Sequence, residues 1–146
     1  MSVTVKVSKI NATAILPQYM TVGAAGCDVS ACLEKPIAVE PLQRIAVPTG
    51  LTVEIPAGYE IQVRPRSGLA LKKGLTVVNA PGTIDSDYRG EVKILLVNLN
   101  PATVEIEPGE RIAQLVLGKV EQIQWTESAT LSETSRGAGG FGSTGK

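Results

Sequence analysis

Between residues 37 and 64, short apolar segments alternate with prolines and glycines, and this spacing restricts the fold more than any other feature. The breaks fall at Pro41, at 48–50 (PTG) and at 56–58 (PAG), and they separate segments 37–39, 44–47, 51–55 and 60–64. Aromatic residues make up only 3% of the chain, while Val, Ile, Leu and Thr are abundant. This composition favours many short strands over helices. The pattern predicts an all-β domain, either a β-sandwich or a β jelly roll.

Further strands are predicted along the rest of the chain, with one short helix. The strands lie at 3–10, 75–78, 92–97, 103–106, 111–117 and 120–124. The helix follows Ser67, a good N-cap residue, and stops at Gly74, where a helix C-terminus favours glycine. A chain of 146 residues is the size of one domain. We expect a β jelly-roll domain over 1–125 and a flexible, glycine-rich C-terminal arm over 126–146, where the composition shifts to Ser, Thr, Ala, Glu and Gly.

Charge and residue usage exclude several kinds of function. The formal net charge is zero and the charges are interspersed, so no basic stripe is available for binding DNA or RNA. The chain has no histidine, which removes the usual general base and the commonest transition-metal ligand. Catalysis must therefore use carboxylates, hydroxyls, Arg or Lys, with a hard metal ion if one is needed.

The cysteines and the apolar segments indicate a cytoplasmic protein. Cys27 and Cys32 lie five residues apart, which in an extended strand sends them to opposite faces and makes a mutual disulfide unfavourable. We interpret them as small, reduced apolar residues rather than redox or metal ligands. We expect no signal peptide at the N-terminus and no segment that spans a membrane.

The stretch 79–91 (NAPGTIDSDYRGE) has the highest density of chemical groups in the chain. Two carboxylates, Asp85 and Asp87, precede Tyr88 and Arg89 within five residues. Apolar strands flank the stretch, and Pro81-Gly82 supplies turn chemistry. It is predicted to form a hairpin arm that carries polar side chains, and the alternative is a solvated turn.

Three other segments contain polar groups that require partners. Asp28 lies between small and apolar neighbours, so it either caps a local turn or faces a cation. Arg66, Ser67 and free backbone N–H groups converge at the start of the predicted helix, which suits a phosphate unless they only cap the helix. Gln114 is polar within an apolar strand, and it must find hydrogen bonds either in the structure itself or on a ligand.

The arm contains residue types that bind nucleotides. Phe141 is the only phenylalanine, and it lies among glycines, with Arg136 before it and Ser143 and Thr144 after it. Glycine-rich backbone beside Arg and hydroxyls suits phosphate, and an exposed ring can stack on a base. The match to a P-loop is poor, so we expect an arm that becomes ordered on binding; the alternative is a disordered terminus.

Together, five segments resemble the five motifs of the homotrimeric dUTPase family (deoxyuridine triphosphate nucleotidohydrolases), in family order and spacing. They are 25–29 (AGCDV), 65–70 (PRSGLA), 82–91 (GTIDSDYRGE), 109–115 (GERIAQL) and 136–145 (RGAGGFGSTG). The resemblance covers nearly the whole chain. It implies a β jelly roll that forms a homotrimer, with three active sites at subunit interfaces and each arm closing over a site built by the other subunits.

The resemblance also implies a reaction and a role for each motif residue. The reaction is hydrolysis of dUTP to dUMP and pyrophosphate, which keeps uracil out of DNA and supplies dUMP for dTMP synthesis. Asp85 would activate the water that attacks the α-phosphorus, and Tyr88 would lie under the deoxyribose. Asp28 would bind Mg2+ through water. Uracil would pair with backbone around Asn79, Gly82, Thr83 and Ile84. Phosphates would contact Arg66, Ser67, Gly68 and Gln114, and the arm would contribute Arg136, Gly140, Phe141, Gly142, Ser143 and Thr144.

The general chemistry agrees with these roles. Mg2+ prefers oxygen ligands and retains waters, so a metal held by phosphates needs no histidine. Phosphoryl substitution depends on positioning and charge stabilisation, with one carboxylate orienting the water. Cytosine would leave buried backbone groups unpaired, a penalty of up to roughly 10⁴-fold in discrimination. Thymine must be excluded by the bulk of its methyl group.

One residue departs from the family pattern, and other functions stay open. Cys27 stands where the first motif often has a tyrosine or another bulky residue, which puts the local packing in doubt but not Asp28. A dCTP deaminase, or a bifunctional deaminase and diphosphatase, is the nearest alternative, although deaminases generally lack the glycine-rich arm. A second alternative is a regulatory binding protein with the dUTPase fold.

Overall fold

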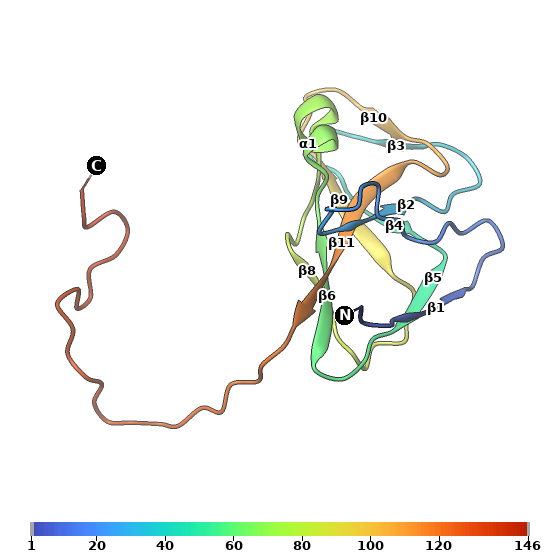
Figure 1. Ribbon diagram of the computed structural model, residues 1–146. Helices are drawn as coiled ribbons and strands as arrows, with labels where there is room; N and C mark the ends of the chain where they lie inside the picture. Colours follow the sequence, from blue (N-terminus) through green and yellow to red (C-terminus); the bar gives the residue numbers. More distant parts are fainter. Residues whose placement is uncertain (1, 146) are drawn as a thin grey trace.

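The computed structural model describes residues 2–145 and consists of antiparallel strands with one short helix (Figure 1). The helix α1 spans Ser67–Lys73. The strands are β1 Lys6–Lys9, β2 Cys27–Ser30, β3 Ile37–Val39, β4 Arg44–Pro48, β5 Leu51–Glu54, β6 Tyr59–Arg64, β7 Leu75–Val77, β8 Gly82–Ile84, β9 Lys93–Asn98, β10 Val104–Ile106 and β11 Arg111–Lys119. The prediction of an all-β fold is confirmed.

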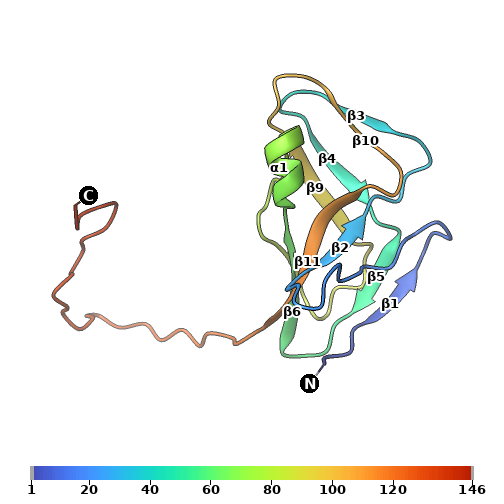
Figure 2. The same ribbon diagram turned by 45° about the horizontal axis from the view of Figure 1, so that its top comes forward.

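The strands pair across long stretches of sequence, as they do in a β jelly roll. The largest sheet has the order β2-β11-β6-β8 and the next has the order β4-β9-β7, while β1 pairs with β5 and β10 with β3. Figure 2 shows β11 crossing the body between β2 and β6. One apolar cluster fills the interior, with buried side chains from both larger sheets, among them Val29, Val47, Ile94, Leu96 and Leu115. Burial of these aliphatic side chains is the main stabilising contribution to such a domain.

Most strand predictions are correct to within two residues at either end, and the two strands that were not predicted share a cause. β1 is shorter than the predicted strand 3–10, and residues 120–124 form no strand within the described part of the chain. Conversely, β2 and β8 were not predicted as strands. Both are short, and both depend on partners that are distant in sequence, since β2 pairs with β11 and β8 pairs with β6. Local alternation cannot reveal such partners.

The helix forms where it was predicted, but its cap differs. Gly74 ends it in the left-handed conformation, with φ 68°, as expected. The predicted N-cap role of Ser67 is wrong, because Arg66 occupies the N-cap position in extended backbone and no side chain caps the helix. Ser67 is the first helical residue and is exposed. Its hydroxyl is therefore not used by the helix itself.

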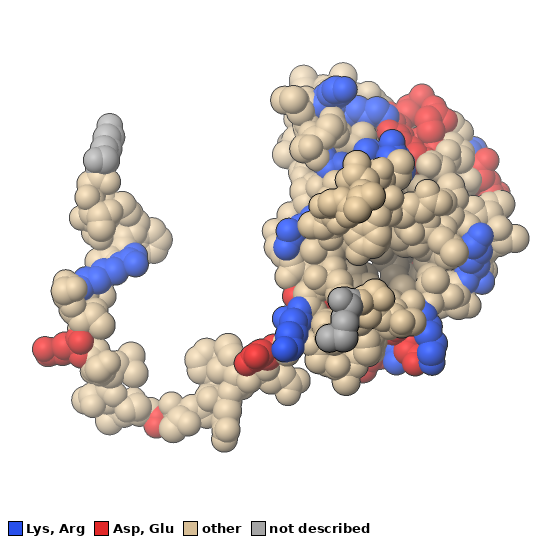
Figure 3. All heavy atoms as spheres, in the orientation of Figure 1, with Lys and Arg blue, Asp and Glu red and all other residues tan. Residues whose placement is uncertain are grey.

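The chain continues past β11 as an extended segment. Residues 120–145 contain no helix or strand in the described structure, and the segment runs away from the body (Figure 1). Both cysteines are free and half-buried. Among residues 2–145, no helix is long and apolar enough to cross a membrane. On the face shown in Figure 3, basic and acidic side chains are interspersed over the body.

Candidate functional site

Three polar side chains lie side by side across the four-stranded sheet. Gln114 of β11 is in register with Asp28 of β2 on one side and with Arg64 of β6 on the other. Residues paired directly across antiparallel strands point to the same face. All three line one pocket of about 420 Å³, together with Arg66 and Arg111. We call this pocket, lined by these five residues, the arginine pocket.

Asp28 is held by two arginines. It is 9% exposed, and its Oδ2 accepts a hydrogen bond from Nη1 of Arg111 at 2.9 Å and lies 3.5 Å from Nη2 of Arg66. Nη1 of Arg66 also donates to the carbonyl oxygen of Arg111, at 3.0 Å. A buried carboxylate needs such partners. Of the two alternatives left open by the sequence, Asp28 faces cations, and its side chain caps no turn among residues 2–145.

The arginine pocket is suited to an anion. Three arginines and one carboxylate line it, and two of the arginines engage Asp28, which leaves an excess of positive charge. Gln114 is half-buried, and its side chain has no hydrogen-bond partner among the described residues. A Cβ atom on Gly26 would lie 3.0 Å from Oε1 of Gln114, so a glycine leaves room for this amide. Ser67 and Gly68 are exposed directly after Arg66.

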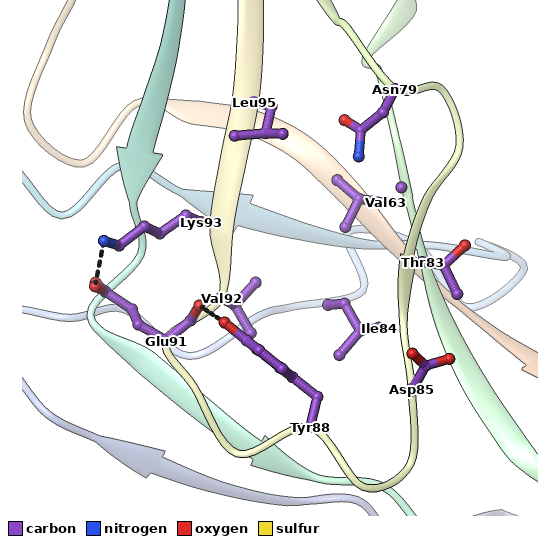
Figure 4. Close-up of a pocket in the computed structure, with 11 residues that line it drawn as sticks. Val63, Asn79, Thr83, Ile84, Asp85, Tyr88, Glu91, Val92, Lys93 and Leu95 are labelled. Atoms are coloured by element: carbon purple, nitrogen blue, oxygen red, sulfur yellow. Dashed lines mark hydrogen bonds and ion pairs between the residues drawn. The ribbon is translucent and has the colours of Figure 1, made fainter.

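A second pocket, of about 280 Å³, is formed by the hairpin predicted at 79–91. β7 and β9 pair with each other. β8 lies between them in the sequence, but it pairs with β6 instead. We call it the hairpin pocket (Figure 4). Six of its residues were predicted site residues: Asn79, Gly82, Thr83, Ile84, Asp85 and Tyr88. Its other lining residues are Val63, Glu91, Val92, Lys93 and Leu95. The stretch is therefore more than a solvated turn.

Hydrogen bonds to the body and within the loop fix the hairpin. The Tyr88 hydroxyl donates to the carbonyl oxygen of Glu91, at 2.9 Å (Figure 4). The Glu91 carboxylate accepts the backbone N–H of Gly50 at 3.0 Å, and the buried Thr49 hydroxyl donates to the carbonyl oxygen of Val92 at 2.6 Å. Arg89 closes the loop, because its Nη1 donates to the carbonyl oxygens of Ser86 and Tyr88, at 2.8 and 3.0 Å. Asp85 is left exposed at the pocket, without a side-chain hydrogen bond among the described residues.

The two pockets of one chain lie on opposite faces of β6. Val63 lines the hairpin pocket, and Arg64, the next residue, lines the arginine pocket. Successive strand residues point to opposite faces of a sheet. The two pockets share no lining residue. The structure therefore brings the predicted residues together in two groups, but it does not join these groups within a single chain.

The predicted arm residues form a third group. Phe141 is fully exposed, and Nε of Arg136 donates to the carbonyl oxygen of Gly139 at 2.8 Å. The C-terminal arm lies away from the body in Figures 1 and 2. The members of this group are Arg136, Gly140, Phe141, Gly142, Ser143 and Thr144.

Sequence reasoning gave no role to four charged residues that line the pockets. These are Arg64 and Arg111 in the arginine pocket, and Glu91 and Lys93 in the hairpin pocket. Arg111 and Glu91 lie within two of the five motifs, so the sequence could have indicated a role for them. Their contacts depend on strand register, which the sequence does not display.

Cys27, the departure from the family pattern, lies outside both pockets. It lines an apolar pocket of about 310 Å³ with Val53, Ile61 and Leu115, so a small side chain at this position leaves space. A side-chain hydrogen bond to Cys27, and the negative charge of the Cys27 thiolate, raise the pKa of the nearby Tyr19. Asp28 points to the arginine pocket, away from this packing.

The described residues contain no group of three or more His, Cys, Asp or Glu side chains that could hold a metal ion. A single carboxylate, Asp28, lies in the arginine pocket, and both neighbouring arginines engage its Oδ2. This donor set does not suit direct binding of a dication by protein ligands. It does fit a role in which a carboxylate contacts the water shell of a metal held by phosphates.

Comparisons with known proteins agree on one family. The sequence model of the dUTPase family matches residues 12–145. A deoxyuridine 5'-triphosphate nucleotidohydrolase of Fusobacterium nucleatum is 59% identical over 131 residues, which cover 90% of each chain.

Solved structures share the fold. A mutant dUTPase of Staphylococcus bacteriophage 80alpha, determined with dUpNHpp, superposes with a TM-score of 0.89 and 26% identity, covering 98% of this chain and 99% of that one. A mutant dUTPase of phage phi11 of S. aureus, described as coordinating a structural Mg(II) ion, has a TM-score of 0.80 and 22% identity, covering 89% and 99%. At that identity the second likeness concerns the fold alone.

Proposed function

We propose a shared-site mechanism for this chain, which belongs to the dUTPase family and is a dUTP diphosphatase. It hydrolyses dUTP to dUMP and pyrophosphate. The single observation behind the mechanism is that the hairpin pocket and the arginine pocket lie on opposite faces of β6 and share no residue. A complete site then needs the hairpin pocket of one subunit and the arginine pocket of another.

The C-terminal arm supplies the remaining part of the site. Its backbone runs away from the body of its own chain (Figure 1). Three kinds of segment, each from a different subunit, make a homotrimer with three equivalent sites the simplest closed assembly. In this proposal, residues 1–125 form the jelly-roll domain and residues 126–146 form the arm that crosses to a neighbour.

The hairpin pocket binds the nucleoside and holds the reacting water. Asp85 is exposed at the pocket without a competing hydrogen bond in the described structure, so its carboxylate is available to orient a water for attack on the α-phosphorus. Tyr88 lies under the deoxyribose. The uracil edge pairs with the backbone of Gly82 to Ile84 and with Asn79, and cytosine would leave these groups unpaired.

The arginine pocket binds the phosphates. Arg66, Ser67, Gly68 and Gln114 contact phosphate oxygens, and the excess positive charge supports this role. When Mg2+ is bound with the triphosphate, it neutralises phosphate charge. Asp28 would contact the water shell of that ion.

The arm closes over the bound nucleotide. Phe141 stacks on uracil, while Arg136, Ser143 and Thr144 hold the γ-phosphate. Gly140 and Gly142 have no side chains, so they allow the backbone to approach the ligand closely. Closure excludes water other than the one that Asp85 holds. The cellular role is to keep uracil out of DNA and to supply dUMP in the cytoplasm.

Product analysis tests the reaction directly. The protein is incubated with dUTP, dCTP, dTTP and UTP in separate reactions with magnesium, and products are followed by phosphorus NMR and chromatography. We expect dUMP and pyrophosphate from dUTP alone. Conversion of dCTP would indicate a deaminase instead, and inactivity toward all four would favour a regulatory binding protein.

A mixed-subunit experiment tests the shared site. An Asp85→Asn chain and an Arg66→Ala chain, each inactive alone, are unfolded together and refolded as a mixture. Activity should return in the mixture, because some sites then combine an intact hairpin pocket with an intact arginine pocket. A mixture as inactive as its components would contradict the shared site.

A further inference from the structure

We propose that Gly90 determines selectivity for the 2'-deoxy sugar, because its missing side chain lets the Tyr88 ring fold across its own loop. This inference rests on the proposed role of Tyr88 under the deoxyribose. Gly90 follows Arg89 in the hairpin and lines neither pocket. Its effect is exerted entirely through the position of Tyr88.

The space next to Gly90 is occupied by the phenol. A Cβ atom built on Gly90 would overlap the Tyr88 hydroxyl oxygen and would lie 2.6 Å from Cζ and 3.0 Å from Cε2 of the ring. Distances this short force one of the two groups to move. The φ angle of Gly90 is not in the left-handed region, so an alanine is compatible with the backbone. The conflict is therefore with the ring alone.

The ring is the part that can move. Tyr88 is 45% exposed, so its ring can rotate outward into solvent at little cost to stability. The loop backbone is held more firmly, because Glu91 accepts a hydrogen bond from Gly50 and Thr49 donates to Val92. A methyl group at position 90 would thus displace Tyr88, break its 2.9 Å hydrogen bond to Glu91 and leave the loop in place.

Displacement of the ring changes which sugars fit. In the folded-back position the ring forms one wall of the hairpin pocket (Figure 4). A wall in contact with the sugar rejects an additional hydroxyl by steric exclusion, and the rejection weakens once the wall moves. The predicted consequence is improved use of UTP relative to dUTP.

The test is a selectivity measurement on Gly90→Ala in the full chain. We expect the ratio of kcat/KM for dUTP to kcat/KM for UTP to fall about tenfold. The thermal unfolding midpoint should stay within about 2 °C of the parent, a shift expected of a surface substitution. Gly23→Ala is the matched control, because a Cβ there meets no atom within 4 Å and Gly23 lies outside both pockets, so the ratio should not change.

Two further variants separate the possible outcomes. Tyr88→Ala is measured in parallel: if it lowers the ratio while Gly90→Ala does not, the inference about Gly90 is wrong and the role of Tyr88 stands. If neither lowers the ratio, both are wrong. The double variant Gly90→Ala/Tyr88→Ala has no ring left for the new methyl group to displace, so Gly90→Ala should have no further effect on the ratio in the Tyr88→Ala background. An equal effect in both backgrounds, or a Gly90→Ala chain that fails to fold, would overturn the inference.

Discussion

The hairpin at 79–91 and the C-terminal arm at 126–145 are both polar, exposed and interrupted by glycine, but they are held very differently. The hairpin is tied to the body through β8, which pairs with β6, and through the hydrogen bonds of Thr49 and Glu91. The hydrogen bonds of the arm are local, such as Ser143 N–H to the Gly140 carbonyl at 3.0 Å. One segment is preorganised by its own chain, and the other is not.

The difference indicates a division of labour between recognition and closure. A preorganised hairpin loses little conformational entropy when a ligand binds, so its contacts are available for affinity and selectivity. In the proposed mechanism the arm becomes ordered when the ligand binds, which costs roughly 1–2 kcal/mol per fixed residue. Its ordering can then be coupled to the presence of a complete substrate.

The largest effect is expected in the hairpin, from Asp85→Asn. The variant should bind dUTP normally while kcat falls about 10³-fold, because an amide cannot act as the general base. Binding is measured by calorimetry with a non-hydrolysable dUTP analogue, and turnover by pyrophosphate release. Asp87→Asn, an exposed carboxylate in the same loop, is the control and should retain activity. A fully active Asp85→Asn enzyme would rule out the proposed base.

The next largest effect is expected from removing the arm. Deletion of residues 135–146 should leave the proposed trimer folded, with kcat/KM for dUTP reduced about 100-fold, because in the proposed mechanism the site no longer closes. Sedimentation and circular dichroism report on the assembly and the fold. Dissociation of the trimer would show instead that the arm has a structural role, and the contrast between the two segments would be lost.

A smaller effect is expected from Phe141→Ala. Because this side chain is fully exposed, the free energy of unfolding should not change, while KM for dUTP should rise about tenfold through loss of base stacking. Leu131→Ala, another exposed apolar residue of the arm, is the matched control. Equal effects of the two substitutions would show that apolar surface in general, rather than stacking, is responsible.

The smallest effect is expected from Thr49→Val at the base of the hairpin. The change keeps the side-chain volume but removes the buried hydroxyl that donates to Val92, so the free energy of unfolding should fall by about 1 kcal/mol. Thr52→Val, at a half-buried position with no side-chain hydrogen bond in the described structure, is the control for chemical denaturation. If both variants were equally stable, the anchoring of the hairpin through Thr49 would be unimportant.

Much of the site could be predicted because its residues are close in sequence. Asn79, Gly82, Asp85 and Tyr88 were singled out together, and they do line one pocket. The N-cap role of Ser67 failed because Arg66 already supplies the extended N-cap residue. The strand predicted at 120–124 does not form. Alternation shows only that a segment could be a strand, and a strand also needs a neighbouring strand to pair with.

Local chemistry was therefore determined by the sequence itself: the short strands, the left-handed Gly74, the polar hairpin and the residue types of the five motifs. The tertiary structure decided which of them meet. Arg111 bonds Asp28 across 83 residues of sequence. Val63 and Arg64 line different pockets. The ring of Tyr88 occupies the space that a side chain on Gly90 would fill. These contacts depend on strand register and on the direction of single side chains. A shift by one residue would reverse every face. The alternation within one strand indicates its buried face, but it does not identify the distant strand that pairs with it.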